Sequence, residues 1–229
     1  SFNVAIGSSA GQQVTTGVEN TLIGGLAGDA LTDADYNVAI GYTALSADTL
    51  GSRSVAIGRA ALQVQNFTSA TNSYNTAVGF AAGEAVTTGQ YNTLIGGLAG
   101  DGMTTGDNNT ALGYTAMSAV VTGDGNTAVG TRAMFTHTTG TMNTGLGRDA
   151  LYSNTVGNYN TAVGEGALYT NVDGSNSVAV GRLALYTQDP ASAVDMHNVG
   201  VGYKAGQSVT TGIQNTLIGG LAGDALQAA

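Results

Sequence analysis

Residues 75–91, NTAVGFAAGEAVTTGQY, are followed directly by residues 92–108, NTLIGGLAGDGMTTGDN. Both stretches are 17 residues long, begin with Asn-Thr, and carry Gly at the fifth place, Ala at the eighth and Thr-Thr-Gly near the end. Self-similarity at a fixed period is the signature of a repeat architecture, in which each unit packs against its neighbours. The pair therefore predicts a stacked array and argues against an ordinary globular domain.

The same unit recurs along the whole chain. Ten of its intervals are 17 residues long, and two, 54–74 and 177–197, are 21 residues long. The fourth place is always Ile, Val or Leu, the eighth is always Ala, and the first is Asn in eleven copies and Ser in two. The units begin at residues 3, 20, 37, 54, 75, 92, 109, 126, 143, 160, 177, 198 and 215. Glycine holds the fifth place in every copy: Gly7, Gly24, Gly41, Gly58, Gly79, Gly96, Gly113, Gly130, Gly147, Gly164, Gly181, Gly202 and Gly219. We predict that residues 1–229 form a single repeat array, and we expect it to be a fragment of a longer fibre.

The start of each unit favours a short β-strand. The pattern Asn-Thr/Val-Ala/Leu-Ile/Val-Gly alternates between two faces with period two, and Val, Ile and Thr are good strand formers. A helix is disfavoured because nearly every unit holds two or more glycines, each costing about 0.8–1 kcal/mol in a helix interior. The Thr-Thr-Gly segment predicts a turn in which glycine adopts a positive φ. We therefore predict an all-β parallel solenoid of thirteen coils, with the Asn side chains of successive coils forming an amide ladder.

The small residues predict a thin core. The constant Ala and Gly require close approach of neighbouring backbones, so each coil buries few large side chains. A buried Val or Ile contributes about 1.5–3 kcal/mol, and two or three of them do not offset the entropy of ordering 17 residues. We expect several chains to share a core.

Composition excludes several classes of function. The net charge is −9 and only six residues are Lys or Arg, spread along the chain, so we expect no nucleic-acid partner. No apolar run approaches the roughly 20 residues that span a bilayer, so we expect no membrane insertion. With no Cys, the chain has neither disulfides nor thiolate metal sites.

The residues that carry most enzyme and metal chemistry are sparse. We interpret His137 and His197, the two histidines, as solvated loop residues. Asp29, Asp101 and Asp224 share one place in the unit but lie three or more coils apart, without calcium-loop spacing, and are interpreted as solvated carboxylates. We therefore predict no catalytic residue, no cofactor and no metal site.

The aromatic residues are the candidates for surface contact. Tyr152, Tyr169 and Tyr186 hold the tenth place of three successive coils and are expected to stack as a ladder. Tyr42, Tyr114 and Tyr203 hold the sixth place of separate coils. Aromatic side chains with polar neighbours can bind sugar rings, and they can equally shield a thin core or a seam between chains.

The segments NVAIG, SVAIG, NTAVG and SVAVG, each with Ala three places after the Gly, resemble the left-handed parallel β-roll of trimeric autotransporter adhesin heads, which have a shorter repeat. GALYTNVDGSNSVAVG and DALYSNTVGNYNTAVG are similar to repeats of phage tail fibres that often end in an endosialidase-type chaperone domain. The resemblance covers residues 3–229. It implies a left-handed β-roll and a homotrimer.

These observations favour a structural and adhesive shaft or head segment of a homotrimeric extracellular fibre. We expect a phage tail fibre on a virion, with a host cell-surface glycan or protein as partner; the alternative is the head of a bacterial surface adhesin. An ice-binding solenoid is a second alternative, although a regular Thr-x-Thr row is missing. A glycan-cleaving enzyme is a third, and we expect the chain not to be an enzyme.

Overall fold

The second to fourth residues of each coil form a three-residue strand, as the alternating pattern predicts. The structure is a computed structural model that describes residues 2–226. These residues form a parallel β-solenoid of about thirteen turns, and no helix occurs among them. The prediction of an all-β solenoid is confirmed. By its contacts the chain divides into two compact units, Ser1–Ala111 and Leu112–Ala229.

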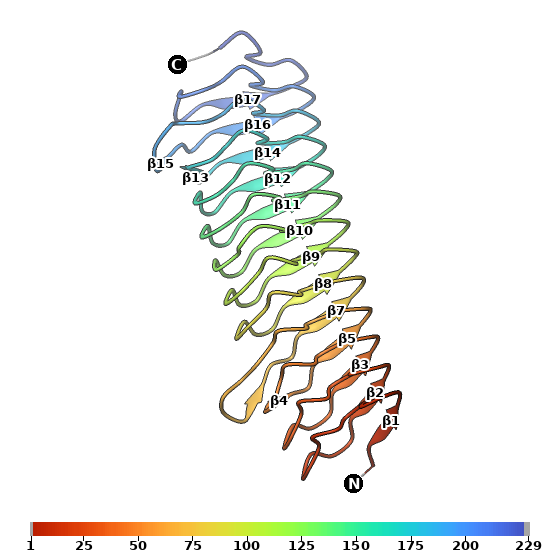
Figure 1. Cartoon of the computed structure of the whole chain (residues 1–229). Helices are drawn as coiled ribbons and strands as arrows, with labels where there is room; N and C mark the ends of the chain where they lie inside the picture. Colours follow the sequence, from red (N-terminus) through yellow and green to blue (C-terminus); the bar gives the residue numbers. More distant parts are fainter. Residues whose placement is uncertain (1, 227–229) are drawn as a thin grey trace. The chain divides into compact units, whose positions relative to one another are not determined.

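Within each unit, the strands pair in parallel and in chain order, one strand to a coil (Figure 1). Partner residues are 17 apart, or 21 apart across the two longer coils. Thr144, for example, pairs with Thr161, and Gly145 pairs with Ala162. The first unit contains β1 (Val4–Ile6), β2 (Thr21–Ile23), β3 (Val38–Ile40), β5 (Val55–Ile57), β7 (Thr76–Val78) and β8 (Thr93–Ile95). The second contains β10 (Thr127–Val129), β11 (Thr144–Leu146), β12 (Thr161–Val163), β14 (Val178–Val180), β16 (Val199–Val201) and β17 (Thr216–Ile218), while β9 (Thr110–Leu112) lies where the units meet in the sequence.

The two 21-residue coils each add a small second ladder. In the first unit β4 (Gly51–Ser52) pairs with β6 (Thr71–Asn72), and in the second β13 (Gly174–Ser175) pairs with β15 (Val194–Asp195). Each ladder connects the end of one coil to the extended segment of the next. The main strands keep their register across the longer interval, since Val55 pairs with Thr76. The four extra residues are therefore absorbed at one corner of the coil.

Each three-residue strand from β2 to β16 buries its middle residue in the core and turns the residues on either side outward. Ala162 in β12 is fully buried, whereas Thr161 and Val163 beside it are half-buried. The constant Ala of the eighth place is buried in every coil from Ala27 to Ala205. Sequence analysis missed a further core column at the ninth place, where seven coils carry Leu or Met: Leu45, Leu62, Met117, Met134, Leu151, Leu168 and Leu185.

The side chains at the third and ninth places share one space in the core. A Cβ atom added to Gly11 or Gly28, at the ninth place, would lie 2.7 or 2.8 Å from a methyl group of Leu22, at the third place. One leucine therefore occupies the space of two ninth-place side chains. Where the ninth place is large instead, the third is small: a Cβ on Gly145 would lie 3.3 Å from Met134 Cε. Since interiors are close-packed, this reciprocity explains the recurring TLIGGLAG block, in which Leu at the third place accompanies Gly at the ninth.

The glycine of the fifth place ends every strand, and geometry requires it. Gly58 and Gly164 have φ of 133° and 127°, a conformation that L-residues rarely adopt. A Cβ on Gly58 would lie 2.2 Å from the carbonyl oxygen of Gly79, its counterpart in the next coil. Both the backbone conformation and the adjacent coil therefore exclude a side chain.

The glycine of the Thr-Thr-Gly segment has a different role from the predicted one. Gly89 and Gly140 do not have positive φ; the residues that close the same coils, Tyr91 and Met142, do, with φ of 58° and 56°. A Cβ on Gly89 would lie 2.5 Å from the carbonyl oxygen of Gly106 in the next coil. Close approach of the next backbone, and not the turn conformation, is what favours glycine here.

The predicted Asn ladder is present and runs through the buried interior. In the second unit, the Asn143 Oδ1 atom accepts the backbone N–H of Asn160 at 2.9 Å, and the Asn160 Nδ2 atom donates to the Gly174 carbonyl at 2.7 Å. Asn160 Oδ1 in turn accepts the backbone N–H of Ser177 at 3.0 Å. Each amide thus bonds to the end of its own coil and to the next coil. Most hydrogen bonds of the ladder join a side-chain amide to the backbone, whereas we predicted that the amides would bond to one another.

Where serine replaces the ladder asparagine, a glutamine supplies the missing amide. Ser177 begins a 21-residue coil, and Gln188 of that coil donates through Nε2 to Ser177 Oγ and to Asn171 Oδ1, both at 3.0 Å. Gln188 Oε1 accepts from Asn198 Nδ2 at 2.9 Å. Ser54 and Gln65 repeat the arrangement in the other extended coil. Buried polar groups are costly unless they are paired, so the Ser and Gln belong together.

Replacing Asn160 by Ala is expected to lower the free energy of unfolding by about 2–4 kcal/mol. The buried Ser177 N–H would lose its partner, and the Gly174 carbonyl would lose one of its two amide donors and keep Asn171. Urea denaturation followed by circular dichroism measures the change. The control is Thr161→Val, which introduces on the outward face a residue that five other coils carry there; it should change stability by less than about 0.5 kcal/mol. Equal effects of the two substitutions would contradict the assigned role of the ladder.

Candidate interaction surface

The sixth and seventh residues of each coil follow the strand-ending glycine and lie at the corner where the chain turns. In the second unit, every Lys and Arg occupies one of these two places: Arg132, Arg148, Arg182 and Lys204. They belong to coils 8, 9, 11 and 12, counted from the N-terminus. We call these four residues the cationic corner. Stacking of the coils brings together cations that are spread over 73 positions of sequence.

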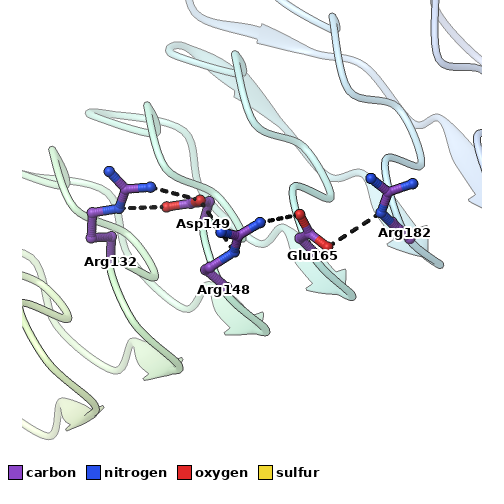
Figure 2. A network of polar contacts seen from close by, with 5 residues as sticks. All are labelled: Arg132, Arg148, Asp149, Glu165 and Arg182. Carbon is purple, nitrogen blue, oxygen red and sulfur yellow. Dashed lines mark hydrogen bonds and ion pairs between the residues drawn. The ribbon is translucent and has the colours of Figure 1, made fainter.

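Two carboxylates link the arginines into a chain of alternating charge (Figure 2). Asp149 Oδ2 accepts a hydrogen bond from Arg132 Nη2 at 2.9 Å, and Arg132 Nε lies 2.9 Å from Asp149 Oδ1 as an ion pair. The same Oδ2 atom lies 3.8 Å from Arg148 Nε. Glu165 pairs with Arg148 on one side and lies 3.2 Å from Arg182 Nε on the other. Asp149 is therefore held between Arg132 of the preceding coil and Arg148 of its own coil, and Glu165 lies between arginines of the two adjacent coils.

The network orders the charges of the corner more than it stabilises the fold. Hydrogen bonds from Arg148 and then Arg182 hold the pKa of Glu165 below its ordinary value, and the hydrogen bond to Asp149 raises the pKa of Arg132. The arginine side chains are about half exposed, and exposed ion pairs contribute little to stability because water and salt screen them. The main effect of the network is to favour the ionised form of Glu165 and to hold the guanidinium groups in fixed positions.

The predicted tyrosine ladder is present beside this corner. The ring centroids of Tyr152 and Tyr169 are 4.9 Å apart and those of Tyr169 and Tyr186 are 5.0 Å apart, with interplanar angles of 6° and 16°. Phe135 extends the stack, with its centroid 5.3 Å from that of Tyr152. Sequence analysis missed Phe135, although it holds the tenth place of the preceding coil, because only tyrosines were considered there. Arg132 lies over the Tyr152 ring at 5.6 Å.

The stacking decides what these rings can bind. Both faces of Tyr152 and of Tyr169 are covered by neighbouring rings, so these two residues present only ring edges and hydroxyl groups to a sugar. Burial raises the pKa of Tyr169. Packing over the corner is therefore its structural role, and any contact with a ligand is through the hydroxyl row.

The sixth-place tyrosines are more exposed than the ladder. Tyr42, Tyr114 and Tyr203 are each about half exposed. They lie in separate coils, so the structure does not join them into one surface. Tyr203 is the one that meets the cationic corner: the Arg182 guanidinium lies 5.8 Å and the Lys204 ammonium 5.4 Å from its ring centroid. Cation–π contact of this kind holds both cations beside one aromatic ring.

A second exposed aromatic group was not identified from the sequence. Tyr74 and Tyr91 close two successive coils of the first unit, and their rings stack at 5.6 Å. Arg53 lies 4.6 Å from the Tyr36 ring centroid and 5.9 Å from that of Tyr74. The sequence feature that could have identified these tyrosines is their common position at the end of the coil, where the backbone has positive φ.

The interpretation of His137 as a solvated residue is wrong. Its side chain is fully buried, with Nδ1 3.1 Å from the Asn154 carbonyl oxygen and Nε2 2.9 Å from that of Gly140. His137 holds the twelfth place of its coil, and this place points into the core in most coils, which the loop-like sequence around it concealed. His197 is exposed, as predicted.

His137 begins a buried column of polar side chains at the twelfth place. Asn154 Nδ2 lies 3.4 Å from His137 Nδ1, Asn171 Nδ2 lies 3.4 Å from Asn154 Oδ1, and Gln188 connects the column to the Asn ladder. In the first unit the same place holds Asp48, which Gln65 bonds at 2.6 Å. Burial raises the pKa of Asp48 and lowers that of His137. No charged side chain among the described residues is paired with His137.

Metal sites, enclosed pockets and membrane-spanning helices are absent from residues 2–226. No group of three His, Cys, Asp or Glu lies together as a metal site there, and no enclosed pocket was found in the same part of the chain. Over that range there is also no helix with the length and apolar character needed to span a bilayer. A scan against protein-family models gives no match, and searches of curated proteins and of solved structures likewise match nothing.

The buried imidazole predicts a pH-dependent stability. Burial keeps His137 neutral in the fold, whereas the unfolded chain binds a proton near the ordinary pKa of 6.5. The pKa of His137 is lower in the folded than in the unfolded protein. The contribution of the neutral imidazole to the free energy of unfolding is therefore fully present above pH 6.5, and it is lost as the pH falls below that value. Between pH 7 and pH 5 the loss should be at most about 2 kcal/mol.

Urea denaturation at pH 7 and pH 5 measures this loss. His137→Asn, which introduces the residue found at the same place in the next two coils, should remove the additional destabilisation at pH 5. His197→Asn is the matched control at the exposed histidine and should leave it unchanged. A His137→Asn protein with the same pH dependence as the wild type would assign the effect to other groups.

Proposed function

We propose that the chain is a structural and adhesive segment of a homotrimeric extracellular fibre, a phage tail fibre carried on the virion, which attaches to a host cell-surface glycan or protein. The finer description of the fold, a left-handed β-roll, belongs to the same proposal. Both rest on the resemblance of the repeat and on the surface that the solenoid leaves uncovered. The head of a bacterial surface adhesin is the alternative setting for the same structure. The proposal assigns no enzymatic activity.

The outward face of the strands carries the proposal. The second and fourth places of successive strands are Thr or Val and Ile, Val or Leu, in register from strand to strand. Fourth-place residues are half-buried or exposed, and Leu146 and Val180 are among the exposed ones. No strand residue from the second to the fourth place is charged in any coil. A face that combines a row of Ile, Val and Leu with Thr and Val and carries no charge is typical of a surface that another protein chain covers.

A second copy of the chain is the partner that fits this face. The face repeats with the period of the coil, and so does the same face of another copy, so a parallel arrangement matches apolar rows along the whole contact. Association also supplies what a thin core lacks, because each coil then buries its branched residues as well as its Ala, Leu and Met. Uncharged strand faces allow this contact without burying unpaired charge.

The same face bears on the ice-binding alternative. Thr127, Thr144 and Thr161 stand in register on three successive strands. The neighbouring row at the fourth place is Val129, Leu146 and Val163, so the face lacks the paired threonine rows of the Thr-x-Thr type. This arrangement favours contact with another chain over ordered water.

Light scattering should give a mass of three chains for the wild type. Val180→Asp, which places a charge on the proposed interface, should raise the dissociation constant at least about 100-fold, because an ionised carboxylate would be buried without a partner. The control is Val156→Asp, since Val156 lies in a turn and has the same exposed fraction, 36%; it should leave the mass unchanged. A stable single-chain mass for the wild type would refute the assembly.

A further inference from the structure

The cationic corner gathers four of the six Lys and Arg residues of the chain. The chain as a whole has a net charge of −9, with 15 carboxylates and six Lys or Arg. The four cations of the corner and its two carboxylates, Asp149 and Glu165, have a net charge of +2. A local charge opposite to that of the surrounding surface is an electrostatic signal for a partner that carries negative charge.

Part of the hydrogen-bonding capacity of this corner is unused. Arg182 meets Glu165 through Nε, and among the described residues neither its terminal Nη atoms nor the Lys204 ammonium is paired with a carboxylate. The Arg182 side chain is 53% and Tyr203 47% exposed. The backbone N–H of Lys204 donates to the Arg182 carbonyl at 2.9 Å, so the two residues lie in adjacent coils at the same corner. Two cations and a phenol therefore face solvent together.

The arrangement suits an extended ligand. The cations occur in coils 8, 9, 11 and 12 and thus extend over roughly 20 Å, because stacked strands are about 4.8 Å apart. Such a row is too long for one small molecule, and no enclosed pocket lies beside it in the described residues. Guanidinium groups pair well with carboxylates through two parallel hydrogen bonds, and the tyrosine hydroxyls of the adjacent ladder can bond to sugar hydroxyls.

We propose that the cationic corner, with Tyr203, binds a carboxylated polysaccharide that lies along coils 8 to 12. This names the chemical class and the place of the glycan contact, and it rests on the proposed attachment function. Arg182 and Lys204 bind successive carboxylates, and Asp149 and Glu165 hold the arginines in line. A nucleic acid fits less well because its denser charge is repelled by the net negative charge of the rest of the chain.

Polygalacturonate is the probe, and uncharged dextran is its control. Immobilised polygalacturonate should retain the wild-type protein at about 0.15 M salt and release it as the salt concentration rises, because screening weakens exposed charge pairs. Dextran should not retain the protein. Absence of retention on polygalacturonate, equal retention on dextran, or stronger retention on single-stranded DNA would each overturn the proposal.

The double variant R182Q/K204Q should weaken binding to polygalacturonate at least about tenfold, since it removes two charge-assisted contacts. The matched control R53Q/R59Q removes two positive charges from the first unit, where Arg59 lies over Phe80 and Arg53 over Tyr36; it should bind like the wild type. Equal weakening by both variants would show that total charge, and not this corner, decides binding, and would overturn the assignment.

Light scattering and circular dichroism on the same samples separate this proposal from the proposed fibre. A single-chain protein that still loses binding only in R182Q/K204Q would refute the trimer and support the cationic corner. A trimer that binds no acidic glycan would support the proposed assembly and refute the binding role of the cationic corner. If R182Q/K204Q loses β-structure, the single variant K204Q tests the corner with the fold intact, because Lys204 takes part in no ion pair among the described residues. K204Q should weaken binding at least about threefold. Unchanged binding would overturn the role of Lys204.

Discussion

Close approach of neighbouring backbones is the constraint on which the rest of this structure depends. At the fifth place of the coil, the carbonyl of one glycine lies where the Cβ of the preceding one would be, 2.2–2.7 Å away in examples such as Gly58 and Gly164. This contact brings the strands into hydrogen-bonding distance and fixes their parallel register. Every other buried column inherits that register, so each side chain meets its counterpart in the next coil.

Because the coils stack in register, a buried residue can change only if the residue at a second, matching place of the coil changes with it. A leucine at the third place occurs with glycine at the ninth, and a serine at the first place occurs with a glutamine at the twelfth. The first pairing conserves volume, and the second conserves hydrogen bonds. Close packing and the cost of unpaired buried polar groups explain both, because an isolated change in either column leaves a cavity, a clash or an orphaned amide. The 21-residue coils keep their place in the solenoid through the second pairing.

The corners are free of these constraints, and there the two units differ. The sixth, seventh and tenth places of the second unit hold arginines, a lysine and four stacked aromatic rings. The same places in the first unit hold mostly small or acidic residues, with Arg59 as the single cation. A uniform core with variable corners lets one scaffold carry different surfaces without a change in backbone. The proposed attachment function uses that freedom, and the proposed assembly uses the uniform outward face of the strands.

The sequence by itself determined the architecture: the period, the strand at the start of each coil, the Asn ladder and the stacking of Tyr152, Tyr169 and Tyr186 all follow from residues that recur at equal places. Tertiary structure decided the features that depend on which way a place points. It buried His137, which a loop-like sequence concealed, and showed that Gly89 makes room for the next coil without a positive φ. It also joined Arg132, Arg148 and Arg182 through Asp149 and Glu165. Periodicity reports what repeats, whereas these contacts arise between residues that do not repeat, and only the packing of one coil on the next brings such residues within reach.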